Sequence, residues 1–302
     1  MMKQNKESVG IAFGLRHISA IRIRHDRTTT ILDSTLEEHS SNFFNAEDYS
    51  SLNHCLNLAL KSVTSWIDNR YVPVRVAIPD PLVITHAMKF DEFPKDRLGQ
   101  HQLVSWQLEK TLHISSESLS VTYYKERCDD EHTRVFITAI DTYLLQTIKS
   151  ALANVMIEPE SVMMSTLYSS LSKKLLLNGL SAYIGFYKEY ISIVVLNAGG
   201  MPHLCRSYWR KSSNICTDEE LQDLIKEMKL TLHAFLNKST GMPVNNLIIY
   251  ADNENEKKFL QLHFKNKGSV SFVDDAFIEM NFDPTIEKEY HSYRSAFNAA
   301  YL

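Results

Sequence analysis

Apolar residues recur along the chain with two periods, one typical of strands and one typical of helices. Short apolar runs at 9–13 and 18–23 are followed by a stretch rich in β-branched residues at 28–36. Polar links separate these runs, which predicts the three strands of a meander. Between 52 and 67 the apolar positions recur every three or four residues, which predicts an amphipathic helix. A short buried strand is expected next, at 74–78, where a proline ends it.

The segment from 82 to 138 has a different order of elements. A strand-like stretch at 82–90 precedes a helix predicted at 97–112, and strand-like stretches follow at 118–125 and 134–140. The order β-α-β-β predicts a small α+β subdomain inserted after the first strands and helix.

The second half of the chain returns to strands. Apolar runs at 182–186, 190–196 and 201–209 predict three more strands. Thr217–Glu220 has the composition of a capping box and predicts the start of a helix whose apolar stripe runs from Leu221 to Phe235. Further helices are expected after Asp141, from Ser161, over 256–264 and, closing the chain, over 290–302.

Two hairpins far apart in the sequence resemble each other. Ile11-Ala12-Phe13 is followed after four residues by Ile18-Ser19, and Ile184-Gly185-Phe186 is followed after four residues by Ile191-Ser192. One interpretation is chance similarity between two apolar hairpins. The other is a duplicated fold, in which two lobes each begin with a β-meander, as in the actin-like, ribonuclease-H-like α/β fold.

The composition of the chain argues against two classes of function, nucleic-acid binding and catalysis on phosphate. The net charge is −4, with 32 basic and 36 acidic residues, so there is no basic excess for binding a phosphate backbone and nucleic acid is not expected as a partner. The nine glycines among 302 residues are few for an enzyme whose backbone must approach phosphate.

The sequence contains no clear pattern of a metal site or of a membrane-spanning helix. The four cysteines form no CxxC pair and the twelve histidines show no HxH or HxxxH spacing, so no metal site is expected. The apolar runs are much shorter than the ~20 residues of a spanning helix, and no signal peptide is recognised. A cytoplasmic protein is therefore predicted.

The chain resembles the PilM family, the cytoplasmic actin-like proteins of type IV pilus assembly, which include MshI- and HofM-type members. The resemblance extends from about Val9 to Leu302 and rests on the order of the segments 9–14, 76–80, 90–94 and 184–199. It implies an actin-like two-lobed fold with a small α+β subdomain inserted in the first lobe. The implied boundaries are 1–160 for the first lobe, 161–302 for the second, about 82–138 for the insertion and about 213–244 for a reduced helical appendage.

The resemblance also implies binding of ATP and Mg²⁺, and the residues argue against it. Actin-like ATPases hold the triphosphate between two hairpins, each with an Asp-x-Gly pattern. Here Ala12 and Gly185 stand at the two Asp positions, and Tyr187 replaces the second glycine, so that only Gly14 remains. The loop Tyr250–Asn253, where the family has its adenosine loop, contains no glycine. The side chain of Tyr187 would crowd the phosphate space.

Carboxylates from elsewhere could replace the lost ligands, whereas a close approach of backbone to phosphate has no side-chain substitute. The candidates are Asp80, Asp252, Asp274 and Asp275, although acidic loop residues are mostly solvated surface. We therefore expect nucleotide-site remnants, no catalytic residues, no required cofactor and no ATP hydrolysis. The alternative is a nucleotide-dependent actin-like ATPase.

The favoured function is that of an adaptor, peripheral to the inner membrane through its partners. The resemblance implies that it binds the N-terminal cytoplasmic peptide of a PilN-like inner-membrane protein and connects it to a pilus assembly ATPase. The peptide would lie where the first lobe meets the insertion, against an edge strand; the alternative is that this strand is fully paired inside its own subdomain. The candidate peptide-binding residues are Pro79, Leu82, Val83, Ile84, His86 and Phe90, with the Trp106 face of the insertion as the next choice.

Overall fold

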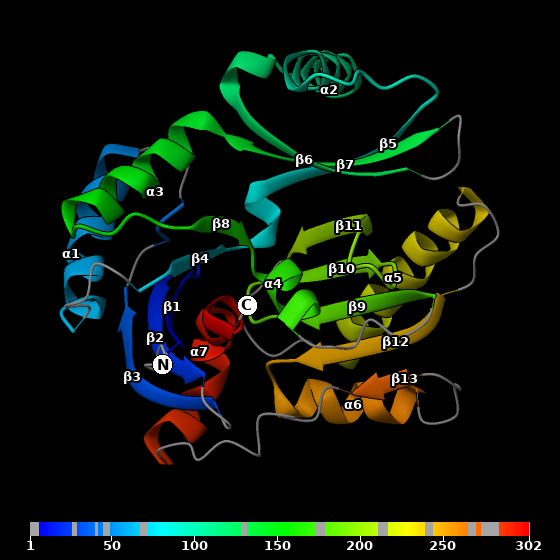
Figure 1. Ribbon diagram of the computed structural model, residues 1–302. Coiled ribbons are helices and arrows are strands. Elements are labelled where there is room, and N and C mark those ends of the chain that lie inside the picture. Colours follow the sequence, from blue (N-terminus) through cyan, green and yellow to red (C-terminus); the bar gives the residue numbers. More distant parts are fainter. Residues whose placement is uncertain are drawn as a thin grey trace, which may run out of the picture. The chain divides into compact units, whose positions relative to one another are not determined.

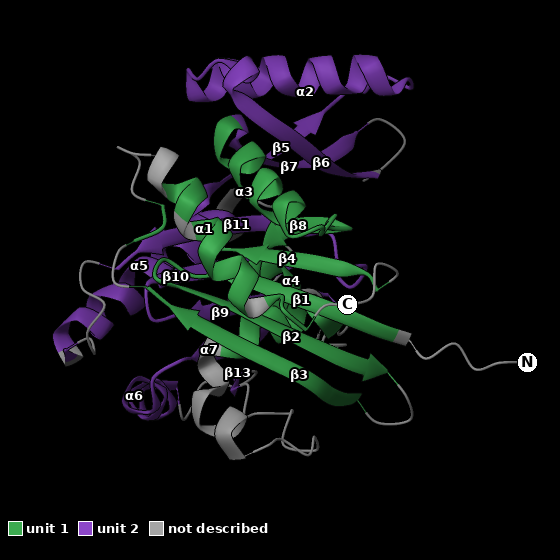
Figure 2. Cartoon of the chain, turned by 90° about the vertical axis from the view of Figure 1, so that its left-hand side faces the viewer, with its two compact units in different colours: residues 1–80, 143–172, 275–302 green, residues 81–142, 173–274 purple. Residues whose placement is uncertain are grey.

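The structure is a computed structural model of the 302-residue chain. It describes residues 6–25, 29–39, 42–44, 49–66, 72–127, 132–172, 179–210, 217–238, 244–264, 270–272 and 284–301. By contacts the chain divides into two compact units, coloured separately in Figure 2. The first unit comprises 1–80, 143–172 and 275–302, and the second comprises 81–142 and 173–274.

The first unit is built on a five-stranded mixed sheet with the order β3-β2-β1-β4-β8 (Figure 1). β1, β2 and β3 are antiparallel neighbours, whereas β4 and β8 continue the sheet in parallel with β1. Its strands are β1 (Lys6–Phe13), β2 (His17–His25), β3 (Thr29–Glu38), β4 (Val74–Ile78) and β8 (Ser161–Met164), and its helices are α1 (Tyr49–Val63), α3 (Thr142–Asn154), α4 (Ser165–Ser172) and α7 (Pro284–Tyr301).

The second unit contains a sheet of the same design, with the order β11-β10-β9-β12-β13. The pairing directions repeat those of the first sheet, and every residue of β9 and β10 is buried. Its strands are β9 (Leu180–Phe186), β10 (Tyr190–Leu196), β11 (Pro202–Trp209), β12 (Val244–Ala251) and β13 (Val270–Phe272), and its helices are α5 (Asp218–Lys238) and α6 (Glu254–Phe264).

The two sheets confirm the predicted duplication. Phe13 pairs with Ile18 at the end of the first hairpin, and Phe186 pairs with Ile191 at the end of the second. The short sequence echo therefore marks residues at matching positions of matching hairpins. The chain has the duplicated α/β fold that the strand pattern predicts.

The insertion is a three-stranded antiparallel sheet with one helix, as the β-α-β-β order predicts. It contains β5 (Val83–Phe90), α2 (Arg97–Leu112), β6 (Leu119–Arg127) and β7 (Thr133–Asp141), with the strand order β5-β7-β6 and short 3₁₀ turns at Asp80–Leu82 and Ser116–Ser118. Asp96 caps α2 by accepting a hydrogen bond from the Gly99 amide at 2.7 Å. Val104 and Leu108 of α2 pack on the buried side of β7, and Figure 1 shows α2 along one face of this sheet.

The structure divides the chain differently from the expected boundaries. A helix is expected to open at Ser161, but Ser161–Met164 forms β8, which pairs with β4 and extends the first sheet beyond residue 160; the helix α4 begins only at Ser165. The closing helix, α7, also belongs to the first unit. The first lobe therefore consists of three separate chain segments, and the insertion groups with the second sheet by contacts.

The packing of α7 explains a glycine in the middle of β1. A methyl group at Gly10 would lie 1.7 Å from the Ala296 carbonyl oxygen and 2.6 Å from the Ala300 amide nitrogen, so only glycine admits the helix. The Ser8 hydroxyl donates a 2.5 Å hydrogen bond to the Ala300 carbonyl. The core between sheet and helix includes Ala12, Ile21, Ile23, Ala77, Ala296 and Phe297.

The helix α5 is part of the second core and not an appendage to it. Thr217 and Glu220 form the predicted capping box, with the Thr217 amide donating to the Glu220 carboxylate at 2.8 Å and the Glu220 amide donating to the Thr217 hydroxyl at 3.3 Å. The apolar stripe packs against β9, β10 and β12 through Leu221, Ile225 and Met228. The expected appendage at 213–244 is thus a sheet-covering helix over its described residues.

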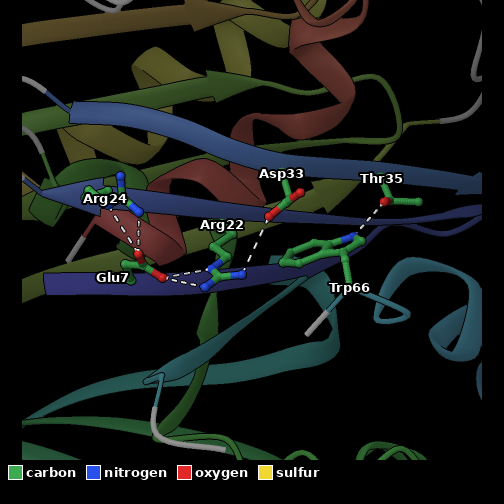
Figure 3. A network of polar contacts seen from close by, with 6 residues as sticks. All are labelled: Glu7, Arg22, Arg24, Asp33, Thr35 and Trp66. Carbon is green, nitrogen blue, oxygen red and sulfur yellow. Dashed lines mark hydrogen bonds and ion pairs between the residues drawn. The ribbon is translucent and has the colours of Figure 1, made fainter. Parts of the chain in front are cut away.

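Charged side chains lie on the first sheet beside its apolar core (Figure 3). Glu7 accepts paired hydrogen bonds from Arg22, at 3.0 and 2.5 Å, and from Arg24, at 3.2 and 2.8 Å. Arg22 also lies 3.7 Å from Asp33, and the Trp66 indole donates to the Thr35 hydroxyl at 2.8 Å. The two guanidinium groups hold the pKa of Glu7 below its usual value, with the hydrogen bond from Arg24 as the largest cause.

Candidate functional site

The first hairpin is closed over its glycine. Ala12, at the expected Asp position, is 2% exposed and packs in the apolar core beneath α7. The Gly14 amide donates to the His17 carbonyl at 2.8 Å, so this amide is already hydrogen-bonded. A methyl group at Gly14 would lie 2.1 Å from Cε1 of His17, which means that the imidazole covers the glycine backbone. The retained glycine accommodates a ring of its own chain.

The second hairpin is closed in the same way by a larger ring. Tyr187 is 6% exposed, and its Cε2 would lie 2.3 Å from a methyl group placed at Gly185. The ring stacks on Tyr190, with centroids 4.6 Å apart and planes at 23°, and lies 5.7 Å from the ring of Tyr250. The Tyr187 amide donates to the Tyr190 carbonyl at 2.9 Å. Stacked aromatic side chains therefore occupy the face of the hairpin on which Gly185 lies.

Asp252 serves this hairpin structurally. One carboxylate oxygen accepts a hydrogen bond from the Lys188 amide at 2.8 Å, and the other accepts one from the Tyr250 hydroxyl. The Asp252 amide donates to the Phe186 carbonyl at 2.9 Å, which ties the end of β12 to the end of β9. Both carboxylate oxygens of this replacement candidate therefore have protein donors.

The other acidic candidate that can be described is Asp80. It is wholly buried and accepts a hydrogen bond from the Thr166 amide at 3.1 Å, at the start of α4. A carboxylate is favoured there by the unpaired amides and the dipole of the helix. Asp274 and Asp275 lie outside the described residues.

The peptide-binding candidates divide between the two faces of the insertion. Ile84, His86 and Phe90 are on the face that α2 covers, because they pair with β7 in register with its α2-facing residues; Ile84 and Phe90 pack against the core there. Burial lowers the pKa of His86. Val83 is on the opposite face, while Pro79 precedes the short 3₁₀ turn Asp80–Leu82 and Leu82 is its last residue. The structure does not gather all six residues on one surface.

Strand β5 is an edge strand, paired along its length with β7 alone in its own sheet. Within the second unit its Thr85 hydroxyl donates a 2.7 Å hydrogen bond to the Cys205 carbonyl of β11. Part of the β5 surface thus lies against the second sheet. Trp106 lies on α2, 56% exposed, with the Lys110 ammonium 5.2 Å from its ring centre.

The described residues give no membrane span and no metal cluster. No helix among them is both long enough and apolar enough to cross a bilayer. No group of three or more His, Cys, Asp or Glu side chains in the described ranges is arranged to hold a metal ion.

Comparison with solved structures gives the fold class, whereas no known protein family and no curated protein matches the sequence. The chain is similar to a chain of a PilM–PilN type IV pilus biogenesis complex, with a TM-score of 0.75 and 13% identity over 97% of both chains. The fold is actin-like and PilM-like. It is also similar to a Bacteroides thetaiotaomicron protein with an actin-like ATPase fold and unknown function, with a TM-score of 0.53 and 14% identity over 90% of this chain and 92% of that one.

A third neighbour of this actin-like chain is the cytoplasmic domain of EpsL, an inner-membrane component of the type II secretion system of Vibrio cholerae. The TM-score is 0.51 and the identity 9%, over 96% of this chain and 94% of that one. The two matching sheets described above are therefore the two halves of an actin-like fold.

Sequence reasoning missed the residues that complete the second hairpin of this actin-like protein. Tyr187 is predictable as an obstruction, but its partners Tyr190 and Tyr250 come from different strands. The tyrosines on these buried strands are a signal that could have indicated polar partners nearby, since buried phenol groups need hydrogen-bond partners. Asp252, two residues after Tyr250, is such a partner.

Proposed function

We propose that this actin-like protein is an adaptor of type IV pilus assembly, or of a related secretion or competence system, on the cytoplasmic side of the inner membrane. Its partner is a PilN-like inner-membrane protein, bound through an N-terminal cytoplasmic peptide, and a pilus assembly ATPase is a further candidate partner. The observation that carries the proposal is the likeness over 97% of both chains to a chain of a PilM–PilN complex. The EpsL likeness supports the same class of membrane-attached machine.

We further propose that the protein does not hydrolyse ATP. The His17 ring lies over Gly14, and the Tyr187 ring lies over Gly185 in a stacked aromatic cluster. Phosphate binding at these hairpins requires exposed backbone amides. The Gly14 and Tyr187 amides are both hydrogen-bonded within their own hairpins.

The peptide site we favour is the segment 79–83, which ends with Val83 at the start of β5. An extended peptide gains backbone hydrogen bonds from a strand edge and selectivity from side-chain pockets. Ile84 and Phe90 contribute to the core under α2, so their role in this proposal is to hold the strand in place. Val83 is the residue to test.

The first experiment is a calorimetric titration with a synthetic peptide that matches the cytoplasmic N-terminus of the PilN-like protein of the same genome. We expect binding by the wild type and a loss of at least tenfold in affinity for Val83→Asp, with a nearly unchanged melting temperature. Ala87→Asp is the matched control, because Ala87 is exposed on the same face of the same strand farther from the unit boundary. Equal affinity for wild type and Val83→Asp would place the peptide elsewhere, with the Trp106 surface next in line.

The second experiment measures the melting temperature with and without MgATP. A ligand that binds at 100 times its Kd stabilises a protein by about 2.7 kcal/mol, which is readily detected. We expect no shift for the wild type and no rescue of turnover by Ala12→Asp alone, because the second hairpin stays filled. A clear shift with MgATP would favour the alternative function, a nucleotide-dependent actin-like ATPase.

A further inference from the structure

The face of the insertion that α2 leaves uncovered touches the second sheet, and it carries polar residues beside the buried Phe136 and Ile140 of β7. On this face Glu126 of β6 pairs in register with Arg134 of β7, and Thr85 of β5 pairs with Thr138 of β7. The contact between Thr85 and the Cys205 carbonyl lies on the same face. The insertion therefore covers part of β11, which is an edge strand of the second sheet.

Glu126 is at the centre of a second group of contacts at this interface. One carboxylate oxygen accepts a 2.5 Å hydrogen bond from the Asn197 amide group, and the other lies 3.4 Å from Nε2 of His203. The Asn197 side chain also accepts hydrogen bonds from the Gly199 and Met201 amides, at 3.0 and 2.9 Å. Glu126 is thus connected to the turn between β10 and β11 and to β11 itself.

Arg134 completes the group from the neighbouring strand. Its Nη1 lies 3.4 Å from Nδ1 and 3.3 Å from Nε2 of His203, and 3.5 Å from the Glu126 carboxylate. The Nη1 atom is therefore nearly equidistant from the two ring nitrogens. We call the four residues Glu126, Arg134, Asn197 and His203 the polar latch.

His203 is the titratable member of the latch that is most enclosed, with 7% of its surface exposed. Burial lowers the pKa of His203, the Arg134 charge lowers it further, and the Glu126 carboxylate acts in the opposite direction. The charged groups in its described contacts are Glu126 of β6 and Arg134 of β7. His203 is accordingly neutral near pH 7, and an imidazolium in this position would lose hydration and face a guanidinium.

We propose that the insertion is a movable arm, and that the polar latch holds it on the second sheet while His203 is neutral. Hydrogen bonds between polar groups can be exchanged for hydrogen bonds to water, so the contacts of the polar latch can open at a modest net cost. Protonation of His203 favours the open arm, because opening lets the imidazolium regain water and move away from Arg134. The sign follows from the direction of the shift: docking is weakened as pH falls below the ordinary histidine value of 6.5.

The test is amide hydrogen exchange of the full chain at pH 7.5 and pH 5.0, followed by mass spectrometry and corrected for the intrinsic effect of pH. We expect peptides covering β6 and β11 to exchange at least tenfold faster at pH 5.0, while peptides covering β1 and β9 serve as an internal reference for global unfolding. His203→Gln keeps a neutral polar side chain and is expected to remove this pH response. His101→Gln, on the exposed side of α2, is the matched control and is expected to retain it.

A third variant tests the latch at constant pH. Glu126→Gln is expected to speed exchange in β6 and β11 at least fivefold at pH 7.5, because it removes the carboxylate charge beside Arg134. Equal exchange of β6 and β11 in the wild type at both pH values would overturn the proposal, whatever the stability of the variants. An unchanged pH response in folded His203→Gln would also overturn it.

Discussion

The two sheets share a strand order but fill their hairpins with different groups. In the first sheet, Gly10 and Ala12 of β1 lie under α7, and the imidazole of His17 covers Gly14 in the turn between β1 and β2. In the second, three tyrosine rings pack where Gly185 leaves room. The pairing of the hairpin strands is the same in both sheets, while the side chains that fill the ends of the two hairpins differ.

This difference changes how a glycine at such a position is interpreted. The PilM resemblance assigns Gly14 to the glycine position of the first phosphate hairpin and Gly185 to the Asp position of the second. Here each of them accommodates a ring from a nearby residue, His17 or Tyr187. A glycine is therefore consistent with a nucleotide site and also with the closure of that site by the chain itself.

The sheets also differ in how they place their ion pairs. Arg210, which follows β11, and Glu256 of α6 form a doubly hydrogen-bonded pair, with 2.8 Å for each contact and side chains 4% and 1% exposed. The Glu7 cluster of the first sheet is more open, since Arg22 and Arg24 are 22% and 35% exposed. We therefore expect that replacing the carboxylate by an amide costs more unfolding free energy in the buried pair than in the Glu7 cluster.

The largest effect is expected for Glu256→Gln. Removing one partner of a buried ion pair leaves the Arg210 charge in a medium of low polarity, which costs about 3–5 kcal/mol of unfolding free energy. Urea denaturation measures the loss. Glu254→Gln is the control, because that carboxylate is 63% exposed and lies 3.8 Å from Lys257; a change there as large as at Glu256 would contradict the difference between buried and exposed pairs.

The next largest effect is expected for substitutions of Gly10 and Gly185, which should differ in their cost to stability. Gly10→Ala would force α7 from β1, since the methyl group meets backbone atoms, and we expect a loss of about 3 kcal/mol. Gly185→Ala meets only the edge of the Tyr187 ring, which can rotate, so about 1–2 kcal/mol is expected. Thermal denaturation ranks the two variants. A greater loss at Gly185 would show that the aromatic cluster is less adaptable than the packing of the helix.

The smallest effect is expected at Glu7. Glu7→Gln should cost about 1 kcal/mol near pH 7, as is usual for partly exposed ion pairs. Because the arginines lower the pKa of Glu7 in the folded state, the wild type keeps this advantage above about pH 4.5 and loses it as the pH falls through the lowered folded value. Denaturation curves of both proteins from pH 7 down to pH 3 should converge; a constant difference would exclude the carboxylate charge as the cause.

Much of the fold could be predicted because local patterns carry it. The alternation of apolar runs and turns identifies both meanders, the β-α-β-β insertion and the capping box at Thr217. The strand β8 was missed because Ser161–Met164 has only four residues, and its strand character comes from pairing with β4, 86 residues earlier at Arg75 and Ser161. No local pattern contains that pairing.

The candidate site was less predictable for the same reason. Ala12 and Tyr187 are visible in the sequence as departures from the Asp-x-Gly pattern. The closure of the second hairpin depends on Tyr250 and Asp252, which β12 brings beside β9. The position of α7 had one local signal, a glycine inside the strand β1, which indicates a close approach of another backbone.

The packing of α7 on β1 also bears on how the chain folds during synthesis. The bond from Ser8 to Ala300 joins residues 292 positions apart, so the first strand and the last helix of the described elements can meet only after all the residues between them have been synthesised. Contacts this distant slow folding, because a long loop must close before they form. During synthesis β1 therefore remains without α7 packed over Gly10, while the second sheet, whose strands lie within 180–272, can assemble earlier. The apolar surface of the first sheet is thus exposed for longer during synthesis than that of the second sheet.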